Sequence, residues 1–308
     1  MNIDQIINEK FEPVSEFVSN IIFYSVNFGE AQIKLIVVWL LIAAVFFSFY
    51  LKFVSFWGFK HSLQLISGKF KERFKNAKGE VSHFQALTAA LSGTVGLGNI
   101  AGVAIAISLG GPGATLWMII AGFLAMAAKF VECSLGLKYR IFNNNGTVSG
   151  GPMYYLRDGL AKKGYIKLGK FLAIFFAIAA IFGSFGGGNM FQSNQAFKQF
   201  VIATGGEASI FYGYGWAFGF IIAILVGIVI IGGIKGIARV TEKVVPLMGG
   251  IYSLAALVII FINYEMIPSA FHSIFTKAFT PEAGMGGVLG VIIIGFQRAT
   301  FSNEAGIG

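Results

Sequence analysis

Ser92-Gly93-Thr94-Val95-Gly96-Leu97-Gly98-Asn99 is the stretch that decides the fold, because it sets three glycines within six positions of the apolar run 84–109. A run of this length can cross a bilayer, which takes about 20 residues of helix. Each glycine weakens a helix by about 1 kcal/mol relative to alanine, so we expect the helix to break here, at mid-membrane depth. Backbone groups freed in hydrocarbon are costly unless they line a cavity or bind a ligand. The sequence therefore predicts that this break binds an ion and a small zwitterion.

The composition is that of a membrane protein. Of the 308 residues, 56% are hydrophobic and 12% are charged, and several apolar stretches approach the length of a membrane helix. We predict an all-α, polytopic protein of the cell (inner or cytoplasmic) membrane, in contact with the lipid bilayer. The net charge of +9 comes from basic residues in short loops between apolar stretches, which is a topology pattern, so we exclude nucleic acid as a partner.

Loop charges predict the orientation. Residues 1–35 form an acidic leader with apolar residues at helical spacing, which fits either an interfacial amphipathic helix or a mobile segment. The loops after the spans 36–59 and 114–137 are rich in Lys and Arg. Short cytoplasmic loops carry such an excess, so the N-terminus is predicted outside. The other predicted spans are 84–109, 171–201 with an interruption at 183–188, 214–234, 244–263 and an incoming span from 286.

A second polar, glycine-rich break is predicted at 300–308, where the sequence reads Thr300-Phe301-Ser302-Asn303-Glu304-Ala305-Gly306-Ile307-Gly308. The carboxylate of Glu304 lies at membrane depth, which makes it a functional candidate. No helix completes this break, so we expect the chain to be a piece of a longer transporter.

The first break offers two kinds of ligand. Its half-helix ends expose amides with partial positive charge and carbonyls with partial negative charge, which suit a carboxylate and a cation. The side chains of Thr94 and Asn99 add oxygens, and oxygen ligands suit a hard cation. Small residues also occur where helices cross closely, and the residues alone leave both interpretations open.

Further polar residues lie in later spans. Gln192 and Gln195 are three apart, so they share a helical face and can bind an amino acid or meet water at an outer helix end. Lys129 and Glu132 are expected to form a structural pair. Gly96-x-Gly98 matches a dinucleotide-binding pattern but follows no strand, and no nucleophile–base set is visible, so we predict no enzyme and no cofactor.

The chain resembles the alanine/glycine:cation symporter family (sodium:alanine symporters), which has the LeuT-like fold of the amino acid-polyamine-organocation superfamily. The matching motifs are Ser92 to Asn99, Gly150-Gly151-Pro152-Met153-Tyr154-Tyr155, Phe191-Gln192-Ser193-Asn194-Gln195 and Phe301 to Gly308. The resemblance implies a 5+5 inverted-repeat fold with one extra N-terminal helix, here 36–59. It makes 84–263 the first five-helix repeat, and 264–308 the outer loop and the first, broken helix of an incomplete second repeat.

The resemblance also implies the site residues. The substrate would be bound by Gly96, Leu97, Gly98, Phe301, Ser302 and Asn303, to which the helical-face argument above adds Gln192 and Gln195. Sodium would be bound by Ser92, Thr94, Val95, Asn99 and Thr300, with the Thr94 carbonyl and the Asn99 side chain in one site and the Ser92 and Val95 carbonyls in a second.

The implied function is symport of small neutral amino acids, alanine or glycine, into the cell by alternating access, coupled to Na⁺ or H⁺. Because helices of the second repeat are missing, we expect this piece not to transport alone. The alternative is an ion channel that uses the broken helix as a filter. The residues leave the oligomeric state open.

Overall fold

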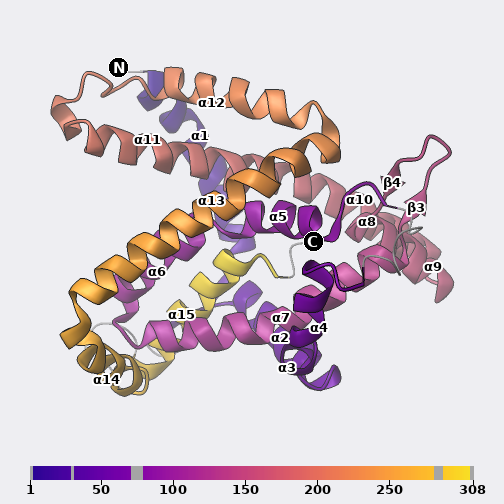
Figure 1. The fold of residues 1–308 in the computed structure, drawn as a ribbon, viewed down its shortest axis with the longest axis horizontal. Helices are drawn as coiled ribbons and strands as arrows, with labels where there is room; N and C mark the ends of the chain where they lie inside the picture. Colours follow the sequence, from indigo (N-terminus) through magenta and orange to yellow (C-terminus); the bar gives the residue numbers. More distant parts are fainter. Residues whose placement is uncertain (1–2, 29–30, 71–78, 281–286, 306–308) are drawn as a thin grey trace. The chain divides into compact units, whose positions relative to one another are not determined.

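The computed structural model describes residues 3–28, 31–70, 79–280 and 287–305. These residues are mostly helical (Figure 1) and divide into two compact units. Unit 1 comprises 1–24 and 156–237, and unit 2 comprises 25–155 and 238–308.

Unit 2 holds both predicted breaks. Its strands form two antiparallel pairs, β1 with β2 and β3 with β4. Its elements are β1 (Ser25–Phe28), β2 (Ala31–Lys34), α2 (Leu35–Tyr50), α3 (Val54–Trp57), α4 (Phe59–Ile66), α5 (His83–Thr94), α6 (Leu97–Gly110), α7 (Ala114–Lys138), β3 (Ile141–Phe142), β4 (Val148–Ser149), α8 (Pro152–Tyr154), most of α13 (Gly233–Ile262), η5 (Tyr264–Met266), α14 (Ile267–Lys277) and α15 (Gly287–Asn303).

Unit 1 is built from helices. The leader, predicted as an amphipathic helix or a mobile segment, is helical as α1. The elements of this unit are α1 (Ile3–Ile22), most of η2 (Tyr155–Gly159), α9 (Leu160–Lys162), α10 (Ile166–Gly183), η3 (Ser184–Met190), α11 (Phe191–Ala203), η4 (Gly206–Ala208) and α12 (Gly215–Ile230).

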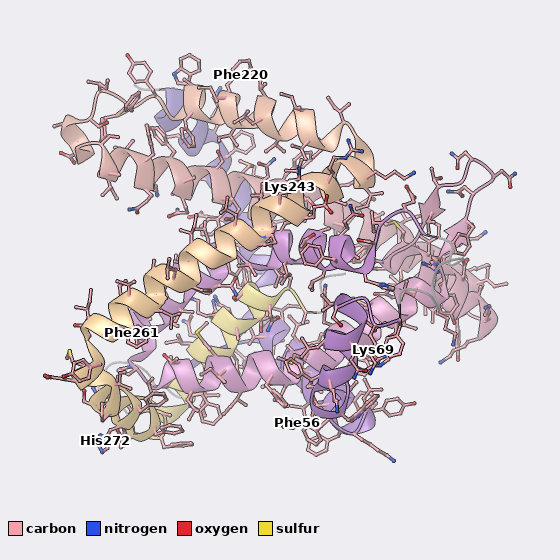
Figure 2. All side chains as sticks on the ribbon, in the orientation of Figure 1. Phe56, Lys69, Phe220, Lys243, Phe261 and His272 are labelled. Atoms are coloured by element: carbon pink, nitrogen blue, oxygen red, sulfur yellow. The ribbon has the colours of Figure 1, made fainter. Side chains whose placement is uncertain are left out.

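Length and hydropathy fit membrane crossing. Four helical stretches among the described residues are long and apolar enough to span a bilayer, namely His83–Gly110, Ala114–Lys138, Ile166–Ala203 and Gly233–Ile262. Large apolar side chains are exposed on the apolar helices. Phe220 of α12 and Phe261 of α13, labelled in Figure 2, are 66% and 71% exposed. Apolar side chains on the outside of apolar helices are typical of a surface in contact with lipid.

The core of unit 2 fixes α15 against α6 and α7. Ala106 of α6, Ala114 of α7 and Val291 of α15 are fully buried together, and partly buried apolar side chains surround them. The Trp117 indole N–H donates to the Ala278 carbonyl at 3.0 Å and so ties α7 to the end of α14. This packing positions α15, and with it the second predicted break.

The first apolar helix is shorter than the sequence predicts. The predicted span 36–59 is divided, because α2 ends at Tyr50 and two short helices follow. Lys52 and Phe53 take left-handed backbone angles (φ 50° and 53°), and the Phe53 N–H donates to the Ser48 carbonyl at 2.7 Å, which closes the end of α2. No glycine or proline marks this point, so the apolar pattern gives no sign of it.

Two predicted interruptions are helical. At 183–188, α10 passes into α11 through the wide turn η3, so the helix widens there and does not break. The loop predicted between 234 and 244 forms the first turns of α13, which begins at Gly233, where the backbone takes φ 62°. Lys and Arg are good helix formers, so a basic stretch at a membrane surface does not by itself end a helix.

The start of α5 is anchored by side-chain hydrogen bonds. Ser82 and Gln85 form a reciprocal capping box, in which the Ser82 hydroxyl accepts from the Gln85 N–H and the Gln85 side-chain oxygen accepts from the Ser82 N–H. The same Gln85 amide donates to a Glu242 carboxylate oxygen of α13 at 2.9 Å. One glutamine therefore both caps α5 and joins it to α13.

Replacing this glutamine is expected to weaken unit 2. Gln85→Ala removes half of the capping box and the bond to Glu242, and should lower the free energy of unfolding by about 2 kcal/mol. Ser82→Ala is the matched control, because it removes only the cap and should cost about 1 kcal/mol. Unfolding in detergent, followed by circular dichroism, measures both. Equal losses in the two variants would show that the bond to Glu242 contributes nothing.

Candidate functional site

The predicted break in the first long apolar stretch is present. α5 ends at Thr94 and α6 begins at Leu97, within the 28-residue apolar stretch His83–Gly110. Between them Val95 is extended (φ −88°, ψ 103°), and Gly96 adopts φ −163° and ψ −145°. The chain is therefore non-helical for two residues in the middle of a candidate membrane span.

Polar side chains shape the ends of this break. The Asn99 side-chain oxygen accepts from the Gly96 N–H at 3.0 Å and so caps α6. The hydroxyls of Ser92 and Thr94 donate to carbonyls one turn earlier, of Ala89 at 2.6 Å and Ala90 at 3.0 Å. A hydroxyl that donates its hydrogen keeps its lone pairs, and a capping amide oxygen keeps a second acceptor position. These side chains therefore combine a structural role with acceptor capacity toward a cation.

The second predicted break begins where α15 ends. The helix stops at Asn303, whose side-chain oxygen accepts from the Ala305 N–H at 3.0 Å. Glu304, between them, has a left-handed backbone (φ 51°). The Thr300 hydroxyl donates to the Phe296 carbonyl at 2.8 Å. The rest of this predicted break, 306–308, lies outside the described residues.

The structure brings the two breaks together. A Cβ built on Gly98 would lie 2.7 Å from the Ser302 Cα and 3.3 Å from the Ser302 hydroxyl oxygen, so the first turn of α6 touches the last turn of α15. A Cβ built on Gly93 would lie 3.5 Å from a carboxylate oxygen of Glu304. The stretch 92–99 and the end of α15, predicted as opposite walls, are thus neighbours in unit 2.

The helix ends at this point carry opposite partial charges. The C-terminal ends of α5 and α15 present carbonyl oxygens, and the N-terminal end of α6 presents amides. A carboxylate is favoured at the amide end and a cation at the carbonyl ends. A small zwitterion accompanied by a cation matches this arrangement of charge.

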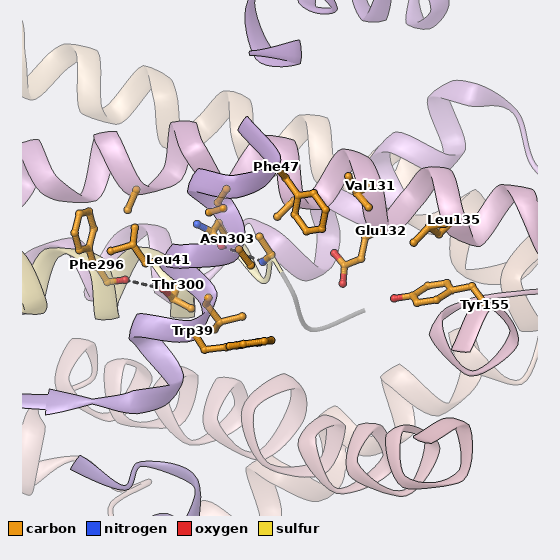
Figure 3. A pocket seen from close by; sticks show the side chains of 17 residues that line it. Trp39, Leu41, Phe47, Val131, Glu132, Leu135, Tyr155, Phe296, Thr300 and Asn303 are labelled. Carbon is orange, nitrogen blue, oxygen red and sulfur yellow. Dashed lines mark hydrogen bonds between the residues drawn. The ribbon is translucent and has the colours of Figure 1, made fainter. Parts of the chain in front are cut away.

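A cavity of about 220 Å³ lies on another side of α15, between α15, α2 and α7 (Figure 3). Thr300 and Asn303 belong to its wall, whereas the stretch 92–99 does not. Other lining residues come from α2 and α7 and include Trp39, Leu41, Phe47, Val131 and Leu135. No sequence motif predicts this cavity, because its walls come from segments that are far apart in the sequence.

One end of this cavity is polar. Glu132 of α7 pairs with Lys129 at 3.1 Å, which confirms the pair predicted from their spacing. Tyr155 points toward Glu132 in Figure 3. Burial, and then the negative charge of Glu132, raise the pKa of the Tyr155 hydroxyl, so this group remains a hydrogen-bond donor to a higher pH than an ordinary tyrosine.

The two predicted glutamines lie on α11 in unit 1. The Gln195 amide donates to the Asn194 side-chain oxygen at 3.2 Å. Their part in binding a substrate stays a prediction, as does that of Phe301, whose side chain is 48% exposed.

Comparison with known proteins gives the family. The model of the sodium:alanine symporter family matches residues 16–308. The chain belongs to this family. It is a transporter family and not an enzyme family.

Individual relatives agree with the family. The chain is 42% identical to the sodium/alanine symporter AgcS of Methanococcus maripaludis over 87% of its own length and 57% of that relative. It is 38% identical to the putative sodium/proton-dependent alanine carrier protein YrbD of Bacillus subtilis, over 81% and 48%. It is 35% identical to the probable sodium/glutamine symporter GlnT of the same organism, over 89% and 54%. The chain spans about half the length of the curated relatives it matches.

Proposed function

We propose that the protein imports small neutral amino acids, alanine or glycine, together with Na⁺ by alternating access. The observation that carries this proposal is the contact between the broken α5–α6 helix and the end of α15, through Gly98 and Ser302. The names of relatives, which include a sodium/alanine symporter, support alanine as a substrate and Na⁺ as the coupling ion.

In this proposal the carboxylate of the amino acid binds the amides at the start of α6, from Gly96 to Gly98. The cation binds oxygens at the end of α5 and on Asn99, and Thr300 to Asn303 supply the facing wall. Bound together, the ion and the amino acid lower the cost of taking each other's charge out of water.

The close backbone contact favours a small substrate. The spacing between α6 and α15 at Gly98 leaves no room for even one methyl group on that glycine. Walls that approach so closely let backbone amides reach the carboxylate directly, and exclude long side chains of the substrate. From the family we also infer a LeuT-like 5+5 inverted-repeat fold, and from the basic loops an N-terminus outside the cell membrane.

Uptake into vesicles tests the proposal. The protein, purified and reconstituted into vesicles, should accumulate radiolabelled alanine when an inward Na⁺ gradient is applied, and uptake should saturate with alanine. An equal K⁺ gradient serves as the control. Alanine-independent Na⁺ flux that does not saturate would support the channel alternative, in which the broken helix acts as a filter.

A further inference from the structure

We propose that Glu304 supplies the negative charge that balances the coupling cation in the binding site. The inference rests on the proposed symport and adds a residue to the cation side of that site. It starts from the approach of the Glu304 carboxylate to Gly93, where a Cβ would lie 3.5 Å from the nearer oxygen. Gly93 precedes the last residue of α5, so the carboxylate lies beside the carbonyl end of the broken helix.

The backbone at Glu304 indicates that the side chain is needed. Its φ of 51° is in the left-handed region, where glycine is favoured and other residues are strained by about 1 kcal/mol or more. The position follows the last residue of α15, where helices often place a glycine. A half-buried glutamate that accepts this strain is expected to have a functional reason.

The carboxylate has no basic partner among the residues that the structure describes. The ion pairs found there join Lys129 to Glu132 and Arg157 to Asp158. Glu304 takes part in neither, and in no other ionic contact within the described part of the chain. A half-buried carboxylate without a basic partner favours a cation beside it, because it is costly to take an unpaired charge partly out of water.

Charge balance identifies the kind of ligand. A zwitterionic amino acid adds no net charge, whereas Na⁺ adds one positive charge. With Glu304 ionised, a site loaded with one Na⁺ and one zwitterionic amino acid is neutral, and the carbonyl ends of α5 and α15 add further negative potential on the same side. Cation binding therefore neutralises a charge that the empty protein has to keep in contact with water. A neutral site can close away from water at lower cost than a charged one, so binding of the cation favours closure of the site.

Replacement of the charge without change of shape tests the inference. Glu304→Gln is expected to raise the Na⁺ concentration that supports half-maximal alanine binding by about tenfold or more, because a charge close to the ion is lost. Alanine affinity at saturating Na⁺ should change much less. The measurement is binding of radiolabelled alanine to the purified protein across a Na⁺ titration. Glu265→Gln is the matched control, since Glu265 lies exposed in the outer segment η5.

A second variant covers the case in which Glu304→Gln does not fold. Gly93→Ala replaces a glycine inside α5 with the best helix former, and its methyl group would stand in van der Waals contact with the Glu304 carboxylate. It should raise the same half-maximal Na⁺ concentration several-fold, because the methyl group displaces an ion or water from that side.

The outcomes separate this inference from the proposed function. An unchanged Na⁺ dependence in both variants would overturn the role of Glu304 and leave the proposed symport standing. Alanine binding by the unmodified protein that ignores Na⁺ would overturn the proposed function itself. A raised Na⁺ requirement in the Glu304 variant, with the Glu265 variant unchanged, is the supporting result.

Discussion

Gly98→Ala is expected to abolish most alanine binding and to destabilise unit 2. The new Cβ would lie 2.7 Å from the Ser302 Cα, a backbone atom that cannot rotate away. α6 and α15 must therefore move apart at the point where the two breaks meet. Overpacking of this kind costs about 1–3 kcal/mol. The amides at the start of α6 would also lose their position relative to the facing wall, and binding should fall by at least about tenfold.

The matched control for this change is Gly102→Ala, four residues later on α6. The nearest atom to a Cβ at Gly102 is the Leu97 carbonyl oxygen at 3.7 Å, which is ordinary contact. This variant should fold and bind alanine as the unmodified protein does. Binding of radiolabelled alanine and thermal unfolding in detergent report on both variants. Full alanine affinity in Gly98→Ala would show that the contact between α6 and α15 does not form the site.

The sequence is most informative where a local rule acts within a few residues. Three closely spaced glycines of low helix propensity predict a break, and the structure confirms it at Val95 and Gly96. The Asn99 side chain caps α6, a role that is not predicted from the sequence, and its part in cation binding stays a prediction.

Features that depend on the surroundings are harder to predict. The end of α2 at Tyr50 depends on left-handed residues that no glycine marks, and the basic start of α13 reads as a loop although it is helical. The glycine-rich stretch 183–188 predicts a break, but in the structure the chain stays helical there and forms the wider turn η3. In each case hydrogen bonds between backbone groups are retained, as an apolar environment demands.

Contacts between segments that are distant in the sequence cannot be predicted from local patterns. The contact between Gly98 and Ser302 is foreseen only through the family resemblance, because about two hundred residues separate the two positions in the sequence. The bond between Gln85 and Glu242 and the cavity beside Glu132 have no motif, since each joins helices that are far apart along the chain.

Gly295→Ala, about two turns before the end of α15, is expected to displace the end of that helix. A Cβ at Gly295 would lie 2.7 Å from the Trp117 Cβ and 2.8 Å from the Ala114 carbonyl oxygen, so α15 cannot stay seated on α7. Ser302 is seven residues further along, about two helical turns, and a shift of α15 at Gly295 reaches it through the rigid helix. The variant should lose about 1–3 kcal/mol of stability and should also weaken alanine binding.

A control on the facing helix separates packing from helix propensity. Gly122→Ala lies on α7 with no atom within 4 Å of the added Cβ, so it should leave stability unchanged or slightly raised. Thermal unfolding and alanine binding are measured on the pair. Lower stability with unchanged alanine affinity in Gly295→Ala would mean that the end of α15 is positioned by α6 alone. Loss of both would mean that α7 holds the second wall of the site in place, and that the glycines of α6 and α15 act together to set its width.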